Sequence, residues 1–263
     1  MYVVIIRRNT MSFSFEGKRI LVTGAGRGLG RAIVESFVKS GGSVFALDIK
    51  QELLDDVTKS FPTVVTAVID LSKWDEVKEI VQKLGPMDHL VNNAGVFIYE
   101  PILEATESAV DKVLSVNFKA VLNMCQIFAK NVIQNEIKGA TIVNVSSLAG
   151  QRPYPVGTQH SGTIYSCSKA AVDMLTKNLA VEFAQYDIRV NGIAPGPMIT
   201  GLMDNLPPDV RQGLKTSAIK ARQLVPGVAE LDDVAFIALY LSSPVAKFIT
   251  GSINVVDGGV GTA

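Results

Sequence analysis

Tyr165 and Lys169 are four residues apart in a stretch with a helical pattern, so we expect both side chains on one face of a helix. A tyrosine keeps its proton up to a pKa near ~10, and a fixed cation beside it favours the phenolate and brings proton exchange toward neutral pH. The pair is therefore suited to donate a proton to a carbonyl oxygen or to accept one from an alcohol. Because this spacing also occurs on solvated helix faces, its interpretation depends on the rest of the chain.

A glycine-rich loop follows an apolar run near the start of the chain. Residues 19–23 have the pattern of a strand, and Gly24, Gly26, Gly28 and Gly30 come next, before a helical pattern. Glycine lets the backbone adopt positive φ and approach a ligand closely, and the start of a helix offers unpaired N–H groups to a phosphate. The arrangement predicts a site for the pyrophosphate of a dinucleotide.

A second strand-like run, residues 43–47, ends in Asp48, 24 positions after Gly24. An acid at about this distance accepts hydrogen bonds from the ribose hydroxyls of NAD and repels the 2′-phosphate of NADP. We therefore expect NAD(H) as the cofactor. Lys50 places a cation close by, which leaves NADP(H) as the alternative.

Further motifs occur in a fixed order along nearly the whole chain. They are Thr23-Gly24-x-x-x-Gly28-x-Gly30, Asn92-Asn93-Ala94-Gly95, Asn117, Ser147, Tyr165-x-x-x-Lys169 and Pro195-Gly196. Together they resemble the motifs of the short-chain dehydrogenase/reductase family. A second set is similar to the branch of L-xylulose reductases and carbonyl reductases. It comprises Asp70-Leu71-x-x-Trp74, Gly85-Pro86-x-Asp88, Leu103-Glu104-x-Thr106, Asp173-Met174-Leu175-Thr176-Lys177 and Val256-Asp257-Gly258-Gly259.

The resemblance implies a catalytic role for each of four side chains. Tyr165 donates the proton while the nicotinamide delivers hydride, and Ser147 bonds the same carbonyl oxygen. Lys169 lowers the pKa of the tyrosine and bonds the nicotinamide ribose, and Asn117 holds a water that links the lysine to solvent. Without the resemblance, Ser147 has the pattern of a turn hydroxyl, and Asn117 in its helical run would face solvent or kink the helix.

The resemblance also implies the cofactor contacts. Arg27 falls where NADP(H)-using members carry a basic residue, whereas the L-xylulose reductases, which generally prefer NADP(H), lack an acid at the position of Asp48. The expected contacts are Asp70 and Leu71 with the adenine, Asn93 and Gly95 with its ribose, Met198 and Thr200 with the carboxamide, and Gly24, Arg27, Gly28, Leu29, Gly30, Asp48, Tyr165, Lys169 and Pro195 with the rest of the cofactor.

Strand and helix patterns alternate along the chain, which is typical of right-handed βαβ units and a parallel sheet covered on both faces. The fold class is therefore α/β, a single Rossmann-type doubly wound parallel sheet of about seven strands, with ligands beyond the carboxyl ends of the strands. Besides 19–23 and 43–47, we expect strands near 64–70, 89–93, 140–146, 188–194 and 252–256, and helices near 73–84, 106–134, 163–184 and 229–242.

The 263 residues, 48% hydrophobic and 19% charged, suffice for one large core without a disulfide or metal. We expect a flexible N-terminal extension at 1–11 without a targeting signal, then one domain at 12–263. Basic and acidic residues both number 25, which predicts no binding to nucleic acid or membrane. Cys125 and Cys167 are too few for a disulfide framework or a metal site, and they indicate a reducing, cytoplasmic compartment. Cys167 is expected to be a small buried hydrophobe, with an oxidation-sensitive thiol as the alternative.

Long helices near 106–134 and 163–184 carry apolar residues on more than one face. Relatives pair these helices between subunits, so we expect a homotetramer, with a dimer as the alternative. The segment 148–162 is longer than family members usually have, and 201–225 is expected to form a lid. Side chains that would bond a polyol or dicarbonyl, or else decorate the surface, are Gln151, Arg152, Gln159 and His160.

The expected function is NAD(P)(H)-dependent reduction of a sugar or dicarbonyl, with Tyr165 as the proton donor. A steroid or 3-oxoacyl reductase of the same family is one alternative. A non-catalytic NAD(P)-binding sensor or scaffold is the alternative from a different class, and the intact set of four catalytic residues disfavours it. The exact substrate, the direction and the stereochemistry do not follow from the residues.

Overall fold

In the part of the chain that the computed structural model describes, residues 13–153, 162–198, 200–203, 224–225 and 229–262, seven parallel strands form one sheet. Their order is β3-β2-β1-β4-β5-β6-β7, which confirms the doubly wound α/β fold expected from the sequence. The strands are β1 (Arg19–Thr23), β2 (Ser43–Asp48), β3 (Val65–Val68), β4 (His89–Asn92), β5 (Ala140–Val145), β6 (Ile188–Pro195) and β7 (Ile253–Val256).

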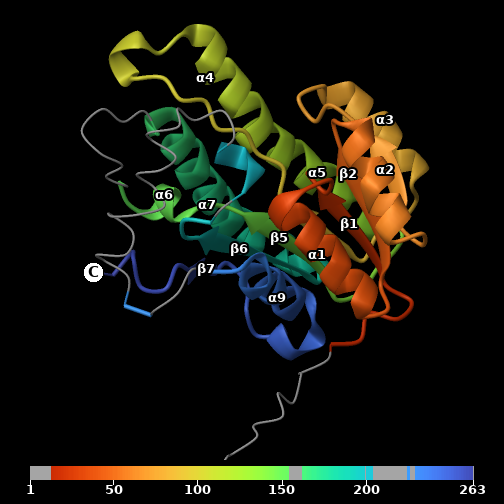
Figure 1. Cartoon of the computed structure of the whole chain (residues 1–263). Coiled ribbons are helices and arrows are strands. Elements are labelled where there is room, and N and C mark those ends of the chain that lie inside the picture. The colour runs from red at the N-terminus through yellow and green to blue at the C-terminus, as the bar shows by residue number, and fades with distance from the viewer. Residues whose placement is uncertain (1–12, 154–161, 199, 204–223, 226–228, 263) are drawn as a thin grey trace, which may run out of the picture.

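Helices cover both faces of the sheet (Figure 1). The α-helices are α1 (Gly28–Lys39), α2 (Gln51–Ser60), α3 (Trp74–Lys83), α4 (Glu107–Leu114), α5 (Ala120–Gln134), α6 (Leu148–Gln151), α7 (Thr163–Phe183) and α9 (Leu231–Ser242). Shorter turns are the 3-10 helices η1 (Ile102–Glu104), η3 (Ala184–Tyr186), η4 (Gly201–Met203) and η5 (Pro244–Ala246), and the π turn η2 (Ser115–Lys119).

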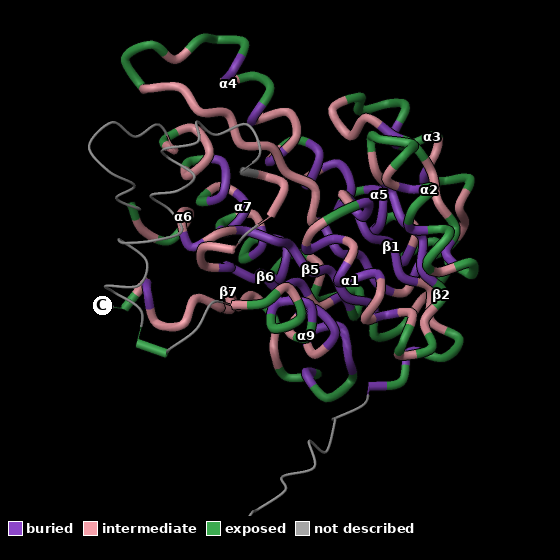
Figure 2. Tube along the Cα trace, viewed as in Figure 1, coloured by how far each residue is buried: buried purple, intermediate pink, exposed green. Residues whose placement is uncertain are grey.

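Alternation along β1 explains why both faces are covered. Ile20 and Val22 belong to a core with α1, α2 and α9, whereas Leu21 between them belongs to a core with α3, α5 and α7. All three side chains are buried. Figure 2 shows buried positions through the central strands and exposed positions on the outer faces of the helices. With both faces occupied, a ligand approaches the sheet at the ends of its strands.

The helix expected at 106–134 is interrupted in the structure. α4 ends at Leu114, η2 forms a π turn, and α5 begins at Ala120. A π turn changes the hydrogen-bonding register without ending the helix, so the apolar pattern continues on both sides and conceals it. The sequence predicted neither α2 nor α6. α2 buries only two of its residues, which leaves a weak apolar pattern, and α6 is only four residues long.

The strand order reverses at β1, whose neighbours are β2 on one side and β4 on the other. At such a switch point the loops that follow the two neighbouring strands run in opposite directions and leave a crevice. The loops after β1, β4, β5 and β6 carry the motifs found in the sequence. The topology therefore brings those motifs to one edge of the sheet.

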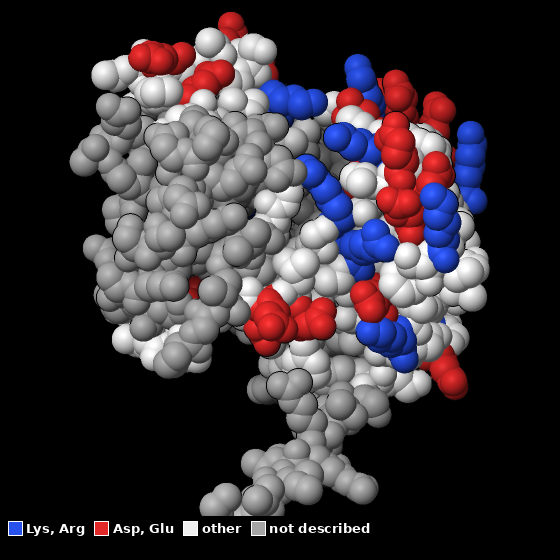
Figure 3. Space-filling view, viewed as in Figure 1, with Lys and Arg blue, Asp and Glu red and all other residues white. Residues whose placement is uncertain are grey.

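Charged side chains of both signs are mixed over α2 and α3 on the face shown in Figure 3. Within the described ranges, each helix is too short or too polar to span a bilayer. The extension expected at 1–11 lies outside the described residues, and the domain boundary at residue 12 stays a prediction.

Burial of His89 is expected to make folding sensitive to acid. The ring Nδ1 lies 2.8 Å from Thr141 Oγ1, and loss of hydration lowers the pKa of His89 to about 4. As the pH falls from the unfolded pKa of 6.5 toward 4, the unfolded chain gains a proton that the folded chain does not, which removes roughly 3 kcal/mol of stability. Urea unfolding should show that His89→Asn loses less stability than the wild-type protein as the pH falls from 6.5 to 4. An unchanged pH dependence in that variant would contradict the assignment.

Candidate active site

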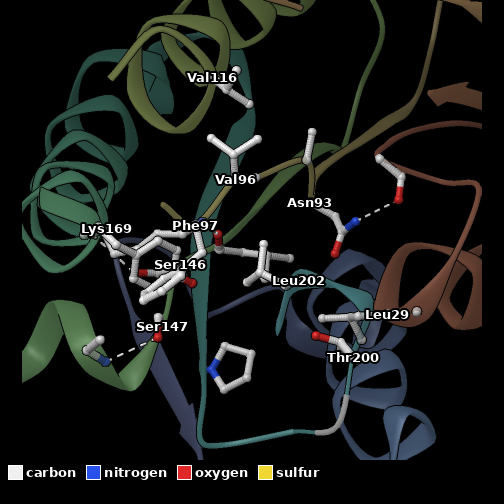
Figure 4. Close-up of a pocket in the computed structure, with 18 of the residues that line it drawn as sticks. Leu29, Asn93, Val96, Phe97, Val116, Ser146, Ser147, Lys169, Thr200 and Leu202 are labelled. Atoms are coloured by element: carbon white, nitrogen blue, oxygen red, sulfur yellow. Dashed lines mark hydrogen bonds between the residues drawn. The ribbon is translucent and has the colours of Figure 1, made fainter. Parts of the chain in front are cut away.

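One cavity of about 1140 Å³ opens at the carboxyl ends of the central strands. Figure 4 shows Lys169 and Ser147 on one side of it and Thr200 on the other. The predicted catalytic and cofactor-binding residues all line this cavity, with the exception of Gly30 and Asn117. Segments far apart in the sequence are thus brought together, although the role of each residue stays a prediction at this point.

The glycine loop is shaped by positions that suit only glycine. Gly24 and Gly28 have φ angles of +62° and +55°, in the left-handed region. Gly30, in the first turn of α1, packs so closely against the carbonyl of Gly24 that a Cβ would overlap it. The first turn of α1 carries no acid, and its N-cap residue, Arg27, makes no side-chain capping bond. Within α1 itself, therefore, no carboxylate competes with an anion for the N–H groups of this turn.

Asp48 ends β2 with its carboxylate held by the backbone. The Gly26 N–H donates to Oδ2 at 2.9 Å, and the Lys50 N–H donates to Oδ1 at 3.1 Å. Each oxygen keeps a second lone pair that can accept from a ribose hydroxyl. Arg27 borders the same cavity, with its guanidinium against Gly201. The acid and the cation expected to compete over cofactor choice therefore both border the cavity.

Asn93 joins the ends of β1 and β4. Its Nδ2 donates to the carbonyl oxygens of Thr23 at 3.1 Å and Gly24 at 3.0 Å. Thr23 Oγ1 accepts from the N–H groups of Asn93 at 3.0 Å and Ala94 at 3.1 Å. These bonds fix the wall of the crevice at the switch point. The expected contact of Asn93 with the adenosine ribose stays a prediction.

Asp70 follows β3 and is accompanied by a cation that the sequence did not single out. Its Oδ1 accepts from the Ser72 N–H at 2.9 Å and from the Ser72 hydroxyl at 2.7 Å. Burial acts to raise the pKa of Asp70, but these bonds and the charges of Lys112 and Lys73 hold it below its usual value. Lys112 reaches the cavity from α4, about 40 residues away along the chain. Such a long-range neighbour leaves no local sequence signal.

Tyr165 lies in the first turn of α7, and its hydroxyl is hydrogen-bonded to the Ser147 side chain. Phe97 packs edge-on against the tyrosine ring, with 5.2 Å between the centroids. Burial raises the pKa of Tyr165 to about 12, and the bond to Ser147 acts in the opposite direction. The sequence instead predicted a pKa lowered by Lys169, but in the structure loss of hydration is the larger effect. The phenol therefore keeps its proton at neutral pH, as a proton donor must.

Ser147 follows β5 and has two local contacts. Its Oγ accepts from the Ala149 N–H at 3.1 Å and so caps α6. The same side chain shares the hydrogen bond with Tyr165. Ser147 is therefore both a hydroxyl that stabilises a turn and a hydrogen-bond partner of Tyr165.

Lys169 lies one turn beyond Tyr165 on α7 and is buried. Its Nζ donates to the carbonyl oxygen of Val145 at 2.9 Å and lies 5.7 Å from the centroid of the tyrosine ring. Burial lowers the pKa of Lys169 to about 8, and the charge of Asp173 acts to raise it. At pH 7 the group is mainly an ammonium, placed between the end of β5 and the tyrosine.

Asn117 lies in the π turn and is fully buried, which excludes the alternative that it merely faces solvent. Its Oδ1 accepts from the Val96 N–H at 2.8 Å, and its Nδ2 donates to the Val96 carbonyl at 2.9 Å and to Ser168 Oγ at 3.1 Å. The side chain thus holds the loop after β4, which carries Phe97. Its role in holding a water stays a prediction.

Two of the four residues expected to meet the substrate have partners within the protein. Gln151 Nε2 donates to Asp173 Oδ2, and Arg152 Nη1 donates to the carbonyl oxygen of Gly261, while both residues line the cavity. Gln159, His160 and most of the segment 201–225 lie outside the described residues.

Cys167 is exposed and lines the cavity, so the expectation that it is a buried hydrophobe is wrong. The first turns of α7 border the cavity. Cys167 therefore faces the cavity instead of packing against a neighbouring element of the fold. Cys125 is buried.

The model of the short chain dehydrogenase family matches residues 18–211. The chain is 39% identical over 249 residues to L-xylulose reductase of Mus musculus, across 95% of this chain and 98% of that protein. It is 38% identical over 248 residues to D-erythrulose reductase of Gallus gallus, across 94% of this chain and 96% of that protein.

Two solved structures are similar over nearly the whole chain. The first is 4-hydroxyisoleucine dehydrogenase complexed with NADH, with a TM-score of 0.83, 32% identity, and coverage of 92% of this chain and 98% of that one. The second is the active-site complex of RhlG from Pseudomonas aeruginosa with NADP, with a TM-score of 0.83, 26% identity, and coverage of 95% and 98%.

The switch-point crevice, the glycine loop and the matches define an NAD(P)-dependent oxidoreductase. The chain belongs to the short-chain dehydrogenase family. Because one similar structure holds NADH and the other NADP, the comparisons leave the preference between the two cofactors open.

Proposed function

We propose that this protein reduces the carbonyl group of a small sugar or dicarbonyl, with Tyr165 as the proton donor and NADH as the preferred cofactor. The observation that carries the proposal is the placement of Tyr165, Ser147 and Lys169 in the wall of the cavity that the glycine loop also borders. The names of the mouse and chicken relatives, reductases of L-xylulose and D-erythrulose, support the class of substrate.

The residues of the cavity fit a nicotinamide dinucleotide. The first turn of α1 lacks a competing acid, which suits the pyrophosphate, and the fixed carboxylate of Asp48 suits a ribose diol. A volume of about 1140 Å³ leaves room for a small substrate beside the cofactor. When bound, the reduced nicotinamide supplies the hydride that carbonyl reduction requires.

The side chains then supply the proton and the stabilisation of charge. Tyr165 gives its phenolic proton to the carbonyl oxygen, and Ser147 donates a hydrogen bond to the same oxygen as negative charge develops there. The Lys169 ammonium, held by the Val145 carbonyl, stabilises the phenolate left on the tyrosine. A water at Asn117 would return a proton from solvent toward the lysine.

A comparison of substrates tests this function. Purified protein with NADH should lose the absorbance of the reduced nicotinamide when L-xylulose or diacetyl is added, and more slowly with a ketosteroid or a 3-oxoacyl thioester. Faster turnover of either of the last two would favour a steroid or 3-oxoacyl reductase. Tight binding of NADH with no turnover of any carbonyl would favour the non-catalytic sensor or scaffold.

Replacing Asp48 with serine should shift the cofactor preference toward NADPH. The change removes the charge that repels a 2′-phosphate, while Arg27 and Lys50 remain beside the site. We expect the ratio of kcat/KM for NADPH over NADH to rise by roughly 10-fold or more, about 1.4 kcal/mol. Initial rates with both cofactors measure it. The matched control is Asp55→Ser, which removes an exposed acid from α2 outside the cavity. Equal ratios in Asp48→Ser and wild type would contradict the role of Asp48.

The assembly we propose is a homotetramer, and two separate apolar surfaces support it. On α7, Met174 and Val181 are 57% and 79% exposed. Around α9 and η5, Val245 and Phe248 are 62% and 99% exposed. A tetramer of twofold symmetry needs at least two different self-complementary surfaces, whereas a dimer needs one.

A charge placed on either surface should therefore halve the assembly. Light scattering at micromolar concentration should give a tetramer for the wild-type chain and a dimer for Val181→Glu and for Phe248→Glu. A monomeric mass for the wild-type chain would contradict the proposal, and a dimeric wild-type mass would favour the alternative.

We place the protein in the cytoplasm. The support is its two unpaired cysteines, because the exposed thiol of Cys167 suits a reducing compartment.

A further inference from the structure

α7 carries a third polar side chain on the face that presents Tyr165 and Lys169. Asp173 follows Lys169 by four residues, so the three groups lie on successive turns of one helix. Asp173 is 5% exposed, and among the described residues its buried Oδ1 has no hydrogen-bond partner. Burying a carboxylate is costly unless an opposite charge or hydrogen bonds compensate. The mechanism proposed above makes no use of this group.

The carboxylate anchors the segment that presents Ser147. Gln151, the last residue of α6, donates from Nε2 to Oδ2 of Asp173. Ser146 Oγ donates to the carbonyl oxygen of Lys169 at 3.2 Å and lies beside the Asp173 carboxylate. The segment is therefore bonded to α7 on both sides of Ser147.

α6 packs closely against α7, so the position of α6 depends on its contacts with that helix. A Cβ at Gly150 would lie 2.8 Å from the carbonyl carbon of Lys169 and 2.9 Å from the amide nitrogen of Ala170. Ser147 is the N-cap residue of α6, so a shift of α6 along α7 changes the distance between Ser147 and Tyr165. A loss of the bond between Gln151 and Asp173 permits such a shift.

Asp173 also acts on Lys169 through its charge. Burial lowers the pKa of Lys169, and the Asp173 carboxylate opposes that effect. Burial likewise raises the pKa of Asp173, against the neighbouring Ser146 hydroxyl, the hydrogen bond from Gln151 and the charges of Lys177 and Lys169. Of the described groups that act on Asp173, the Ser146 hydroxyl after β5 and the Gln151 amide of α6 are uncharged, and Lys177 and Lys169 of α7 are charged. Lys169 itself faces Tyr165 on α7 and the Val145 carbonyl of β5. Its Nζ and the Asn117 amide of η2 both lie close to Gly95.

We propose that Asp173 is a positioning residue of the active site, which anchors α6 so that Ser147 stays within reach of Tyr165 and sustains the positive charge of Lys169. Its kinetic consequence rests on the proposed reductase function. The charge on Lys169 can be measured without turnover.

Three variants separate the anchor from the charge. Asp173→Asn keeps the shape of the side chain and removes its charge, whereas Gln151→Ala removes the anchor and keeps the charge. Thr176→Val is the matched control, because Thr176 is a buried polar residue of the same helix that is bonded to Asn144 and Val172 instead of α6.

The pH profile of kcat should distinguish these variants. In Asp173→Asn, loss of the carboxylate should move the alkaline limb to lower pH by roughly 1 unit, because Lys169 then loses its proton more easily. In Gln151→Ala, kcat should fall by roughly 10-fold with the limb unchanged, the result of a misplaced Ser147. Thr176→Val should lower the urea concentration at the midpoint of unfolding and leave both kcat and its pH profile unchanged. If the Asp173 and Gln151 variants also change only the urea midpoint, the inference is overturned.

Labelling of Lys169 gives a readout that needs no substrate. Acetylation by acetic anhydride across a pH series, followed by mass spectrometry, should report a lower pKa for Lys169 in Asp173→Asn and a value near wild type in Asp173→Glu. The same pKa in Asp173→Asn and wild type would overturn the inference. If the wild-type protein reduces no carbonyl while labelling shows the shift, the proposed function fails and the action of Asp173 on Lys169 stands.

Discussion

Replacing Tyr165 with phenylalanine is expected to lower kcat for carbonyl reduction by roughly 10³-fold, the contribution typical of a general acid. The change removes the hydroxyl alone. The ring keeps its edge-on contact with Phe97, and Lys169 keeps its bond to the Val145 carbonyl, so the shape of the cavity is retained. NADH affinity should therefore stay within about twofold, which marks a loss in the transition state and not in binding. Stopped-flow or steady-state rates, with NADH fluorescence titration, measure both quantities.

Tyr186→Phe is the matched control for this prediction. Tyr186 is an exposed tyrosine in η3 and does not line the cavity, so its hydroxyl should make no difference to kcat. A Tyr165→Phe variant that retains wild-type kcat would show that another group or water supplies the proton. The catalytic assignment of the α7 residues would then have to be abandoned.

Gly30→Ala should destabilise the protein and abolish useful cofactor binding. A Cβ at position 30 would overlap the carbonyl oxygen of Gly24 and lie 2.5 Å from Asn93 Nδ2. That carbonyl cannot move freely, because it accepts from Asn93 Nδ2 at 3.0 Å where β1 and β4 meet. We expect a loss of roughly 3 kcal/mol in stability from overpacking. NADH affinity should fall by about 100-fold, or about 2.7 kcal/mol, since α1 no longer starts at the correct place.

Gly28→Ala separates crowding from backbone strain. At Gly28 the nearest atom to an added Cβ is 3.7 Å away, so the cost comes from the left-handed φ of +55° alone. That cost is about 1–2 kcal/mol. Urea unfolding and NADH titration should therefore rank wild type, Gly28→Ala and Gly30→Ala in order of decreasing stability and affinity. Wild-type behaviour of Gly30→Ala in both measurements would contradict the packing at the glycine loop.

The strands and the convergence of the motifs could be predicted from the sequence because both depend on local pattern. Each expected strand overlaps an observed one, for instance near 140–146, where β5 is Ala140–Val145. Since parallel strands end at one edge of the sheet, a motif placed after a strand is placed at the site. Tyr165 and Lys169 share a helix face for an equally local reason.

Other features depend on packing across the fold and gave no local signal. The π turn that buries Asn117 lies in an unbroken apolar pattern, and Lys112 reaches the cavity from another helix. The pKa of Tyr165 is governed by burial, which the spacing of two residues does not reveal. Asp173 did carry a signal, because it continues the four-residue spacing of the catalytic pair by one further turn. Its partner Gln151 could be found only in the structure.

The most direct test of the reductase function is to measure NADH consumed and alcohol formed together, with L-xylulose as the substrate and NADPH in a parallel reaction. We predict equal molar amounts of oxidised cofactor and polyol, with a higher initial rate for NADH than for NADPH. A protein that binds NADH but consumes none with L-xylulose or diacetyl would contradict the central claim, because the cavity would then bind the cofactor without catalysis.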